Sequence, residues 1–304
     1  MRILVHLHVY YHDQIDWFLN KFTCFNGRDW DLVVSYSEDN PLTRSKVLAF
    51  KKDARFMQVE NVGYDIWPFL KLLDETDYTG YDVLFKFHTK HIDGKKTVHL
   101  NHVHYTGAKW RDELVNSLIG SEERLDDVLR SFESHPEAGM ACSGKLYTRL
   151  YFPEDKELLD EEMKRLNLHT EERRFCAGTM MAFRPAVLKV LADEHFTPSY
   201  FAGAVKTDSG GSMSHVYERI LNQSLSCGTP VVSFESGTAL DMVKGHHTGY
   251  CAKLRDADDF AAGIMKIYSE GKTAFTEECR GIAIERTTGE AFVKRLLEII
   301  EKYS

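Results

Sequence analysis

A cluster of acidic and amide side chains lies in the run Glu60-Asn61-Val62-Gly63-Tyr64-Asp65-Ile66-Trp67. Carboxylates and amides can hydrogen-bond the hydroxyl groups of a polar ligand such as a sugar or a nucleotide. Gly63 permits a tight turn, and Asp65 is placed to begin a helix. Turn and capping chemistry alone would account for these two residues. The whole cluster favours a binding site instead, in which Glu60 and Asp65 hold the ligand.

A second cluster is cationic and ends the next apolar segment, in the run Phe85-Lys86-Phe87-His88-Thr89-Lys90. Alternate side chains of a strand point to opposite faces, so Lys86 and His88 share one face and the phenylalanines share the other. Lysine is seldom buried, and a departing diphosphate needs cationic stabilisation as its charge develops. We therefore expect Lys86 and Lys90 to bind a diphosphate. The alternative is that both side chains extend to solvent.

Histidines recur between residues 88 and 104. Their spacing matches no standard metal-ligand pattern, and no pair of acids is interleaved with them. No metal ligand is therefore predicted. The segment from Asp93 to Thr106 shows little periodicity and is interpreted as an active-site loop.

These clusters need elements that bring them together. Apolar and amphipathic segments alternate over the first 90 or so residues, which predicts the order β-α-β-α-β-α-β and a mostly parallel sheet with flanking helices. The expected strands span residues 3–10, 31–37, 55–60 and 81–88. Ligands bind beyond the carboxyl ends of such strands. The polar runs that follow these ends are Ser35-Tyr36-Ser37, Glu60-Asn61 and His88-Thr89-Lys90.

Composition excludes several classes of protein. The chain has 304 residues and a formal net charge of -8, and an acidic chain is a poor nucleic-acid binder because phosphate contacts need a basic surface. None of the six cysteines forms a CxxC pair, so we expect reduced thiols. No apolar stretch is long enough to span a bilayer, and the N-terminus does not look like a signal peptide. We expect a cytoplasmic protein and leave peripheral association with the membrane open.

Several longer motifs resemble the rhamnan synthesis protein F family. They follow one another over about residues 1–220 and are Glu60-Asn61-x-Gly63-x-Asp65-Ile66-x-Pro68-Phe69, Lys86-x-His88-Thr89-Lys90, Trp110-Arg111-x-x-Leu114 with Leu118-Ile119-Gly120-Ser121, Phe175-x-Ala177-Gly178-Thr179-Met180-x-x-x-Arg184-Pro185, and Gly211-x-x-x-His215-x-x-Glu218-Arg219. The resemblance implies a glycosyltransferase that transfers a sugar, typically rhamnose, during assembly of cell-wall or O-antigen polysaccharide. Its substrates would be a nucleotide sugar, such as dTDP-rhamnose, and a polysaccharide or lipid-linked acceptor.

The same stretch is more distantly similar to family 2 glycosyltransferases of the GT-A fold. There, Asn-x-Gly follows the third strand, as Asn61-Val62-Gly63 does here, and the fourth strand ends in an Asp-x-Asp that holds a divalent metal on the diphosphate. This chain has His88-Thr89-Lys90 at that place. The departure argues against dependence on Mg²⁺ or Mn²⁺, and we expect cationic side chains to neutralise the diphosphate directly. The predicted donor-binding set is Glu60, Asn61, Gly63, Asp65, Lys86, His88, Thr89, Lys90 and Arg111.

The tail resembles a different family. The run from Leu225 to Phe234 and the glycines after it look like the C-terminal domain of family 4 glycosyltransferases, which have the GT-B fold. There, two glutamates hold the donor, at positions that His215 and Gln223 occupy in this chain. We therefore expect a GT-A-like domain over residues 1–222 and a partial GT-B-like segment, without its own donor site, over residues 223–304. The segment's half-sheet would need a partner, either the N-terminal domain or another chain, and the second alternative leaves a dimer open.

A base must take the proton of the acceptor hydroxyl as it attacks the anomeric carbon. In similar GT-A enzymes an acid late in the catalytic domain does this, so the candidates are Glu218 and His215, ranked equally, with Asp208 behind them. A surface ion pair with Arg219 is the alternative role for Glu218. On the acceptor side, small residues let a ligand approach the backbone closely. The predicted acceptor-binding set is Trp67, Ala177, Gly178 and Thr179.

Two rival hypotheses are compatible with the same sequence. The tail could do the chemistry as a GT-B enzyme of family 4, although the absent glutamates argue against it. Alternatively, the chain could be a non-catalytic nucleotide-sugar or glycan-binding remnant of a gene fusion. The missing Asp-x-Asp and the incomplete tail leave room for this second hypothesis. Binding and turnover of nucleotide sugars would discriminate among the three.

Overall fold

The structure is a computed structural model that describes residues 1–92, 97–100, 103–135, 138–148, 153–166, 168, 175–202, 212–223, 231–234, 249–252, 257–270 and 275. The chain forms two compact units. Unit 1 comprises Met1–Leu166 and Arg174–Ser224, and unit 2 comprises Asn167–Arg173 and Leu225–Ser304.

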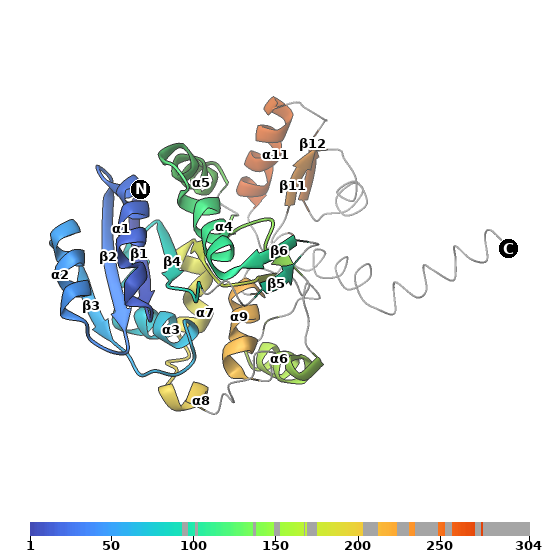
Figure 1. The fold of residues 1–304 in the computed structure, drawn as a ribbon. Helices are drawn as coiled ribbons and strands as arrows, with labels where there is room; N and C mark the ends of the chain where they lie inside the picture. The colour runs from blue at the N-terminus through green and yellow to red at the C-terminus, as the bar shows by residue number, and fades with distance from the viewer. Residues whose placement is uncertain are drawn as a thin grey trace. The chain divides into compact units, whose positions relative to one another are not determined.

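A six-stranded sheet with the order β3-β2-β1-β4-β10-β7 forms the centre of unit 1 (Figure 1). Its four neighbouring parallel strands are β1 (Arg2–Val9), β2 (Asp29–Tyr36), β3 (Arg55–Gln58) and β4 (Val83–His88). Strand β10 (Met181–Phe183) is antiparallel to β4, and β7 (Met140–Ala141) is antiparallel to β10. The predicted mostly parallel α/β sheet is therefore confirmed.

Helices cover both faces of this sheet. The helices on one face are α1 (Ile15–Phe22), α2 (Pro41–Phe50), α4 (Gly107–Ile119) and α5 (Glu122–Ser134). The helices on the other face are α3 (Ile66–Glu75), α7 (Lys189–Ala192) and α9 (Met213–Gln223). Helix α6 (Pro153–Arg165) and the short α8 (Pro198–Ala202) pack against α9. The carboxyl ends of the parallel strands are thus left open between two helical layers.

Short elements connect the larger ones. The 3-10 helices are η1 (His12–Gln14), η2 (Thr23–Phe25), η3 (Tyr78–Gly80) and η4 (Pro185–Leu188). Strands β8 (Tyr147–Thr148) and β9 (Phe175–Cys176) form an antiparallel pair, and β9 leads directly into the turn before β10. That turn contributes to the site described below.

Strand β4 distributes its side chains as the alternation predicted. Phe85 and Phe87 lie on the α1 face, where their ring centroids are 5.3 and 5.4 Å from those of Phe25 and Phe22. Lys86 lies on the α3 face, with its ammonium 5.6 Å from the ring centroid of Phe69. Lys86 is only 1% exposed. The alternative in which this lysine extends to solvent is therefore wrong.

The segment interpreted as an active-site loop contains a hairpin instead. Strands β5 (Thr97–Leu100) and β6 (Val103–Thr106) pair antiparallel, with His99 opposite His104. Thr and His alternate with Val, Leu and Tyr in these strands, and β-branched and aromatic side chains support cross-strand pairing. The interpretation of this whole segment as a loop was wrong because the histidines concealed the period of two.

Unit 2 contains a small α/β arrangement in its described part. Strands β11 (Val231–Phe234) and β12 (Gly249–Ala252) are parallel, and α11 (Ala257–Glu270) contacts both. The sequence pattern predicts short strands at residues 230–234 and 247–252 and an amphipathic helix at 256–268, and these elements are formed. The same pattern predicts a helix at 290–303, which lies outside the described residues, as does the base candidate Asp208.

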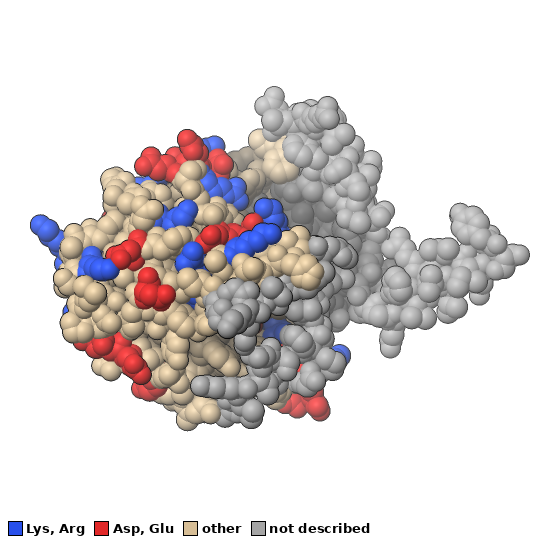
Figure 2. Space-filling model, viewed as in Figure 1, with Lys and Arg blue, Asp and Glu red and all other residues tan. Residues whose placement is uncertain are grey.

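Acidic and basic side chains are interspersed over the described residues of unit 1 on the face shown in Figure 2. No helix among the described ranges is both long enough and apolar enough to cross a membrane.

Candidate active site

A cavity of about 520 Å³ opens at the carboxyl edge of the parallel strands in unit 1. Residues from β1, β4, the turn before α3, helices α4 and α9 and the turn before β10 line it. The predicted site residues among them are Asn61, Asp65, His88, Thr89, Lys90, Gly178, Thr179, His215 and Glu218. The structure therefore brings together residues that are up to 157 positions apart in the chain (218 minus 61).

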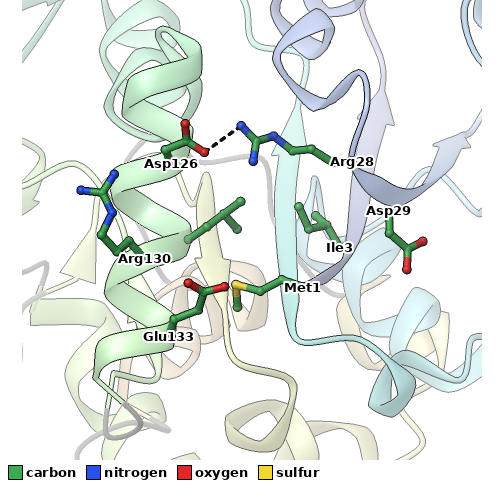
Figure 3. A pocket seen from close by; sticks show the side chains of 8 residues that line it. Met1, Ile3, Arg28, Asp29, Asp126, Arg130 and Glu133 are labelled. Atoms are coloured by element: carbon green, nitrogen blue, oxygen red, sulfur yellow. Dashed lines mark hydrogen bonds and ion pairs between the residues drawn. The ribbon is translucent and has the colours of Figure 1, made fainter.

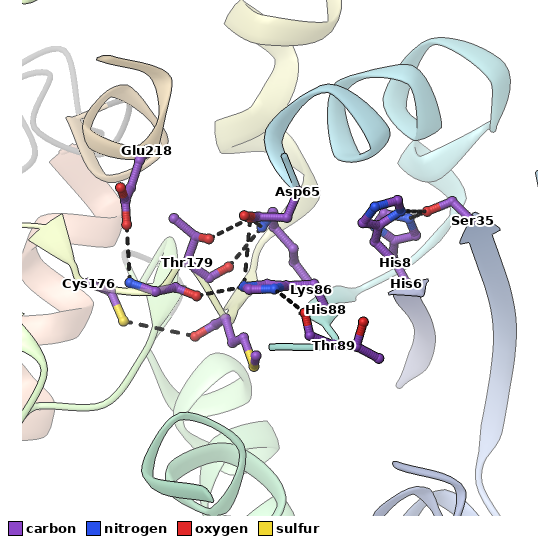
Figure 4. A network of polar contacts seen from close by, with 12 residues as sticks. His6, His8, Ser35, Asp65, Lys86, His88, Thr89, Cys176, Thr179 and Glu218 are labelled. Atoms are coloured by element: carbon purple, nitrogen blue, oxygen red, sulfur yellow. Dashed lines mark hydrogen bonds and ion pairs between the residues drawn. The ribbon is translucent and has the colours of Figure 1, made fainter. Parts of the chain in front are cut away.

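Asp65 is the centre of a polar network at this edge (Figure 4). Its carboxylate forms an ion pair with Lys86 and accepts a hydrogen bond of 2.5 Å from Thr179 Oγ1. His88 Nε2 lies 3.8 Å from the same oxygen. Burial raises the pKa of Asp65, but the charges and hydrogen bonds of His88, Lys86 and Thr179 outweigh it and hold that pKa well below its usual range. Asp65 stands at the start of α3 but makes no capping hydrogen bond, so its role is in the network and not in the cap.

The turn Ala177–Thr179 supplies three successive backbone carbonyls to the site. The Ala177 carbonyl accepts from Trp110 Nε1 at 3.0 Å, the Gly178 carbonyl from His88 Nε2 at 2.8 Å and the Thr179 carbonyl from Lys86 Nζ at 2.9 Å. This arrangement needs a left-handed backbone, with φ of 101° at Gly178 and 49° at Thr179. A positive φ is rare for a β-branched residue such as threonine. The bond from Thr179 to Asp65 helps to hold it.

Among the described lysines and arginines, Lys90 is the one that lines the cavity. Its ammonium lies 3.7 Å from the ring centroid of Trp110, which is a cation–π contact. Burial lowers the pKa of Lys90 from its ordinary value, and the nearby Asp65 and Glu218 offset this only in part. Lys86, in contrast, does not line the cavity and instead pairs with Asp65.

Thr89 and His88 position the neighbouring backbone. Thr89 Oγ1 accepts hydrogen bonds of 2.9 Å from the backbone N–H groups of Tyr10 and Tyr11, which orients the chain after β1. Burial lowers the pKa of His88 to about 4, which favours a neutral ring near pH 7. Its Nε2 lies 2.8 Å from the Gly178 carbonyl and its Nδ1 3.1 Å from the Thr89 carbonyl. A neutral ring can donate to only one of them, and the shorter contact favours donation from Nε2 to Gly178.

Helix α9 brings two base candidates to the cavity. His215 and Glu218 are three residues apart and therefore share a helix face. Glu218 Oε1 accepts a hydrogen bond of 3.1 Å from the Gly178 N–H, and His215 Nδ1 shares one of 2.8 Å with Ser212 Oγ. Both side chains thus reach the region of Lys90 and Asp65.

Several other predicted site residues do not line the cavity. Glu60 accepts a hydrogen bond of 3.0 Å from Trp67 Nε1, and Trp67 is buried. Arg111 is also buried, with its guanidinium 3.8 Å from the ring centroid of Trp17. Gly63 has a φ of 68° and packs closely on Trp67. These residues support the elements of the site, and a direct contact with a substrate remains a prediction for each.

Residue-by-residue reasoning missed several aromatic and imidazole groups of the lining. They are His8, Tyr10, Tyr11, Tyr64, His91 and Trp110. Tyr10 and Tyr64 are about half exposed at the cavity, and Tyr64 has a φ of 54°. The position of His8 and Tyr10 at the carboxyl end of the first strand is the signal that could have identified them.

Two smaller cavities differ in whether they share lining residues with the main cavity. One of about 180 Å³ shares Tyr10 and Asn61 with the main cavity and is also lined by His12, Ser37 and Glu38. Another, of about 360 Å³, lies by the amino-terminal end of β1 (Figure 3). It includes the 2.8 Å ion pair between Arg28 and Asp126 and none of the predicted site residues.

Comparison with known families gives two matches along the chain. The model of rhamnan synthesis protein F matches residues 1–224, and the model of glycosyl transferases group 1 matches residues 220–285. Residues 1–224 make up more than half of the chain and contain the whole cavity lining. Both suspected resemblances are confirmed by these two matches.

Individual relatives are more distant. The protein called "Uncharacterized protein WxcX" from two strains of Xanthomonas campestris pv. campestris is 28% and 27% identical over 175 residues, which is 55% of this chain but only 23% of each relative. The mannosyltransferase PcManGT from Pyrobaculum calidifontis, solved with GDP-Man and Mn²⁺, is 16% identical over 71% of this chain and 50% of that chain, with a TM-score of 0.31. That structural likeness is too weak to support a conclusion about the fold or the donor.

Proposed function

This chain belongs to the rhamnan synthesis protein F family, and we propose that it transfers a sugar, rhamnose in particular, from a nucleotide-sugar donor to a growing cell-surface polysaccharide or a lipid-linked acceptor. The observation that carries the proposal is the placement of Lys90. Its ammonium faces a cavity at the carboxyl edge of a parallel sheet, where a diphosphate would lie.

Two neighbouring cavities that share lining residues suit a ligand with two parts. We place the diphosphate in the larger cavity beside Lys90 and the nucleoside toward the smaller cavity. Tyr10 and Asn61 line both cavities. The sugar would then lie near Tyr64, His215 and Glu218. Aromatic side chains provide the flat apolar surfaces on which bases and sugar rings pack.

In the proposed reaction the oxygen of an acceptor hydroxyl attacks the anomeric carbon of the donor. A carbon–oxygen bond forms there while the bond from that carbon to the diphosphate oxygen breaks. The leaving diphosphate keeps the electron pair, and Lys90 stabilises its charge. The base that takes the proton of the acceptor hydroxyl is on helix α9 and is either Glu218 or His215.

The residues at this edge do not fit a divalent metal held by the protein. Two of the described carboxylates line the cavity. Asp65, at the start of α3, is already paired with Lys86, and Glu218 on α9 accepts the Gly178 N–H. Within the described part of the chain, no group of three His, Cys, Asp or Glu side chains could hold a metal ion. No step of the proposed reaction therefore depends on a metal.

A thermal-shift panel tests the donor. The full chain would be heated with UDP-, GDP- and dTDP-sugars, each with and without Mn²⁺. We expect dTDP-rhamnose to stabilise the protein to the same extent in both conditions. A shift with another sugar nucleotide would correct the donor. No shift with any of them would favour a non-catalytic remnant.

Matched variants identify the base. If Glu218 is the base, Glu218→Gln should lower kcat by about 10²- to 10⁴-fold with little change in KM, whereas His215→Gln should have a smaller effect. The reverse result would assign the role to His215. Two variants that both keep near-normal kcat would rule out α9 as the source of the base.

A further inference from the structure

A buried serine hydroxyl bridges two histidines of the first strand. Ser35 Oγ lies 2.8 Å from His6 Nε2 and 3.0 Å from His8 Nδ1 (Figure 4). The three side chains lie on the α3 face of the sheet, and His8 and Ser35 are register partners on β1 and β2. Burial is the main cause that lowers the pKa of His8 to about 3 and that of His6 well below its ordinary value. Both rings are therefore neutral near pH 7.

The number of N–H and O–H hydrogens on His6, His8 and Ser35 restricts which of them can donate and which must accept. A neutral imidazole carries one N–H, and a hydroxyl carries one hydrogen but can accept at two sites. Ser35 can donate to His8 while His6 donates to Ser35, or the direction of both bonds can be reversed. If both rings donated to Ser35, its hydroxyl hydrogen would have no acceptor, because the described structure gives Ser35 Oγ only these two partners. If both rings offered lone pairs, one hydrogen would have to serve two acceptors.

The orphan nitrogen of His6 decides between the two remaining arrangements. His6 Nδ1 is fully buried and has no hydrogen-bond partner among the described residues. In the first arrangement this atom carries a bare lone pair, and in the second it carries an N–H without an acceptor. Buried N–H groups without acceptors are the rarer of the two in proteins. The first arrangement is therefore favoured.

We infer that Ser35 donates to His8 Nδ1 and that His8 consequently presents an N–H at Nε2 to the active-site cavity. His8 lines that cavity, and with Nδ1 engaged by Ser35 its remaining polar atom is Nε2. Among the described residues, the hydrogen bonds of the His8 ring are with Ser35, through Nδ1 to its Oγ and with its backbone. His8 is thus a fixed, uncharged hydrogen-bond donor on the cavity wall.

Such a donor selects a particular kind of ligand atom. An N–H pairs with a carbonyl, hydroxyl or phosphate oxygen and disfavours another N–H or an ammonium group. If the proposed function holds, the oxygen belongs to the nucleotide-sugar donor. His8 would then add a directional contact beside the less directional charge of Lys90. This makes His8 a specificity-determining residue that the sequence motifs did not indicate.

The tautomer can be measured on the free protein, so the result does not depend on the identity of the donor. Two-bond ¹H–¹⁵N correlation spectra of protein labelled with ¹⁵N-histidine distinguish an Nε2–H ring from an Nδ1–H ring and from a charged ring. The His8 signals would be assigned by their loss in His8→Gln or, if that variant does not fold, in His8→Asn. We expect a neutral His8 with its proton on Nε2 between pH 5 and pH 8. A proton on Nδ1, or a charged ring in that range, would overturn the inference.

A Ser35→Ala variant gives an independent check of the bridge. Without the hydroxyl, His8 Nδ1 loses the hydrogen that fixes its tautomer, so its signals should shift toward a mixture of both forms. Unchanged His8 signals in Ser35→Ala would show that Ser35 does not set the tautomer and would overturn the assigned bridge.

Calorimetry with dTDP and dTDP-rhamnose then locates the oxygen. An asparagine at position 8 reaches only the place of Nδ1, whereas a glutamine amide can donate from the place of Nε2. We expect His8→Asn to weaken binding by about tenfold and His8→Gln to recover most of that loss. A loss seen already with dTDP places the oxygen on the nucleotide, and a loss seen only with dTDP-rhamnose places it on the sugar. Equal affinities of wild type and both variants for both probes would refute the contact. If the wild-type protein binds neither probe, the donor proposed above is wrong, and the tautomer measurement still decides the present inference.

Discussion

Two lysines four positions apart have different environments in this site. Lys86 is 1% exposed and compensates the buried charge of Asp65, whereas Lys90 follows the end of β4 and faces the cavity over Trp110. A buried charge needs a partner to offset its desolvation. The same residue type therefore serves the network at one position and is available to a ligand at the other.

The role of Lys90 predicts a charge-dependent loss of activity. Lys90→Ala should lower kcat by about 10²- to 10³-fold, because a cation that stabilises the leaving diphosphate is removed. Lys189→Ala changes a largely exposed lysine of α7 and serves as the control. Steady-state transfer of sugar from the donor that the thermal-shift panel identifies would measure both. Full activity of Lys90→Ala would remove this residue from the mechanism.

The depressed pKa of Lys90 adds a pH dependence. As pH rises through that lowered pKa, Lys90 loses its charge, so activity should fall at a lower pH than for an ordinary lysine. The guanidinium of arginine has a pKa above about 12 and therefore stays charged over the whole pH range of the assay. Lys90→Arg should therefore shift the alkaline fall to higher pH, whatever its maximal rate. An identical alkaline limb in both proteins would assign the titration to another group.

The lowered pKa of His88 predicts that the folded protein loses stability in acid. The unfolded chain binds a proton to this residue below about pH 6.5, whereas burial lowers the folded pKa to about 4. The stabilisation is therefore complete above the unfolded pKa and is lost as pH falls toward the folded one, at roughly 1.4 kcal/mol per pH unit. His88→Gln keeps an amide donor for the Gly178 carbonyl, so urea unfolding of this variant should show a shallower loss between pH 6.5 and pH 4. His104→Gln, at an exposed position of β6, should keep the wild-type slope. Equal slopes in wild type and His88→Gln would contradict the prediction.

At the scale of elements, the turn between β9 and β10 connects the network to the cavity wall. Its three carbonyls bind side chains from α4 and β4, and its Gly178 N–H binds Glu218 of α9. Two successive residues with positive φ are needed to point these groups outward. The geometry of the site therefore depends on a backbone conformation that few sequences adopt.

This dependence predicts the effect of a single methyl group. A Cβ at position 178 would lie 2.7 Å from Leu114 Cδ1 and 3.0 Å from Trp110 Nε1, at a φ of 101°. Gly178→Ala should cost about 1–3 kcal/mol of unfolding free energy and weaken donor binding, because Trp110 must move away from Lys90. Gly144→Ala is the matched control, since a Cβ there meets nothing within 4 Å. Wild-type unfolding and binding in Gly178→Ala would show that the turn tolerates a side chain.

For the whole molecule, the chain's division into two units raises the question of which part binds the donor. Every residue that lines the main cavity belongs to unit 1. A chain ended after Ser224 should therefore unfold cooperatively and bind the donor with close to full affinity. Chemical denaturation and calorimetry of both lengths would test this. A truncated chain that folds without binding would show that unit 2 takes part in the site.

The sequence alone determined the local features of this protein. Periods of two and of about four predicted most strands and helices, and the polar ends of consecutive strands predicted the edge at which the site lies. Longer motifs indicated the family. These signals are readable because they depend on neighbours within a few residues. The hairpin of β5 and β6 was missed because histidines concealed its alternation.

Only the tertiary structure decided which residues meet. Strand β1 lies between β2 and β4, so Ser35 reaches His8 from 27 positions away, and the fold brings Thr179 to Asp65 across 114 positions. These contacts decide that Asp65 belongs to a charged network and not to a helix cap, that Lys86 is buried while Lys90 reaches the cavity, and that His8 borders the site. The physical reason is that hydrogen bonding and desolvation of buried polar groups depend on their partners in space, which local sequence patterns do not specify.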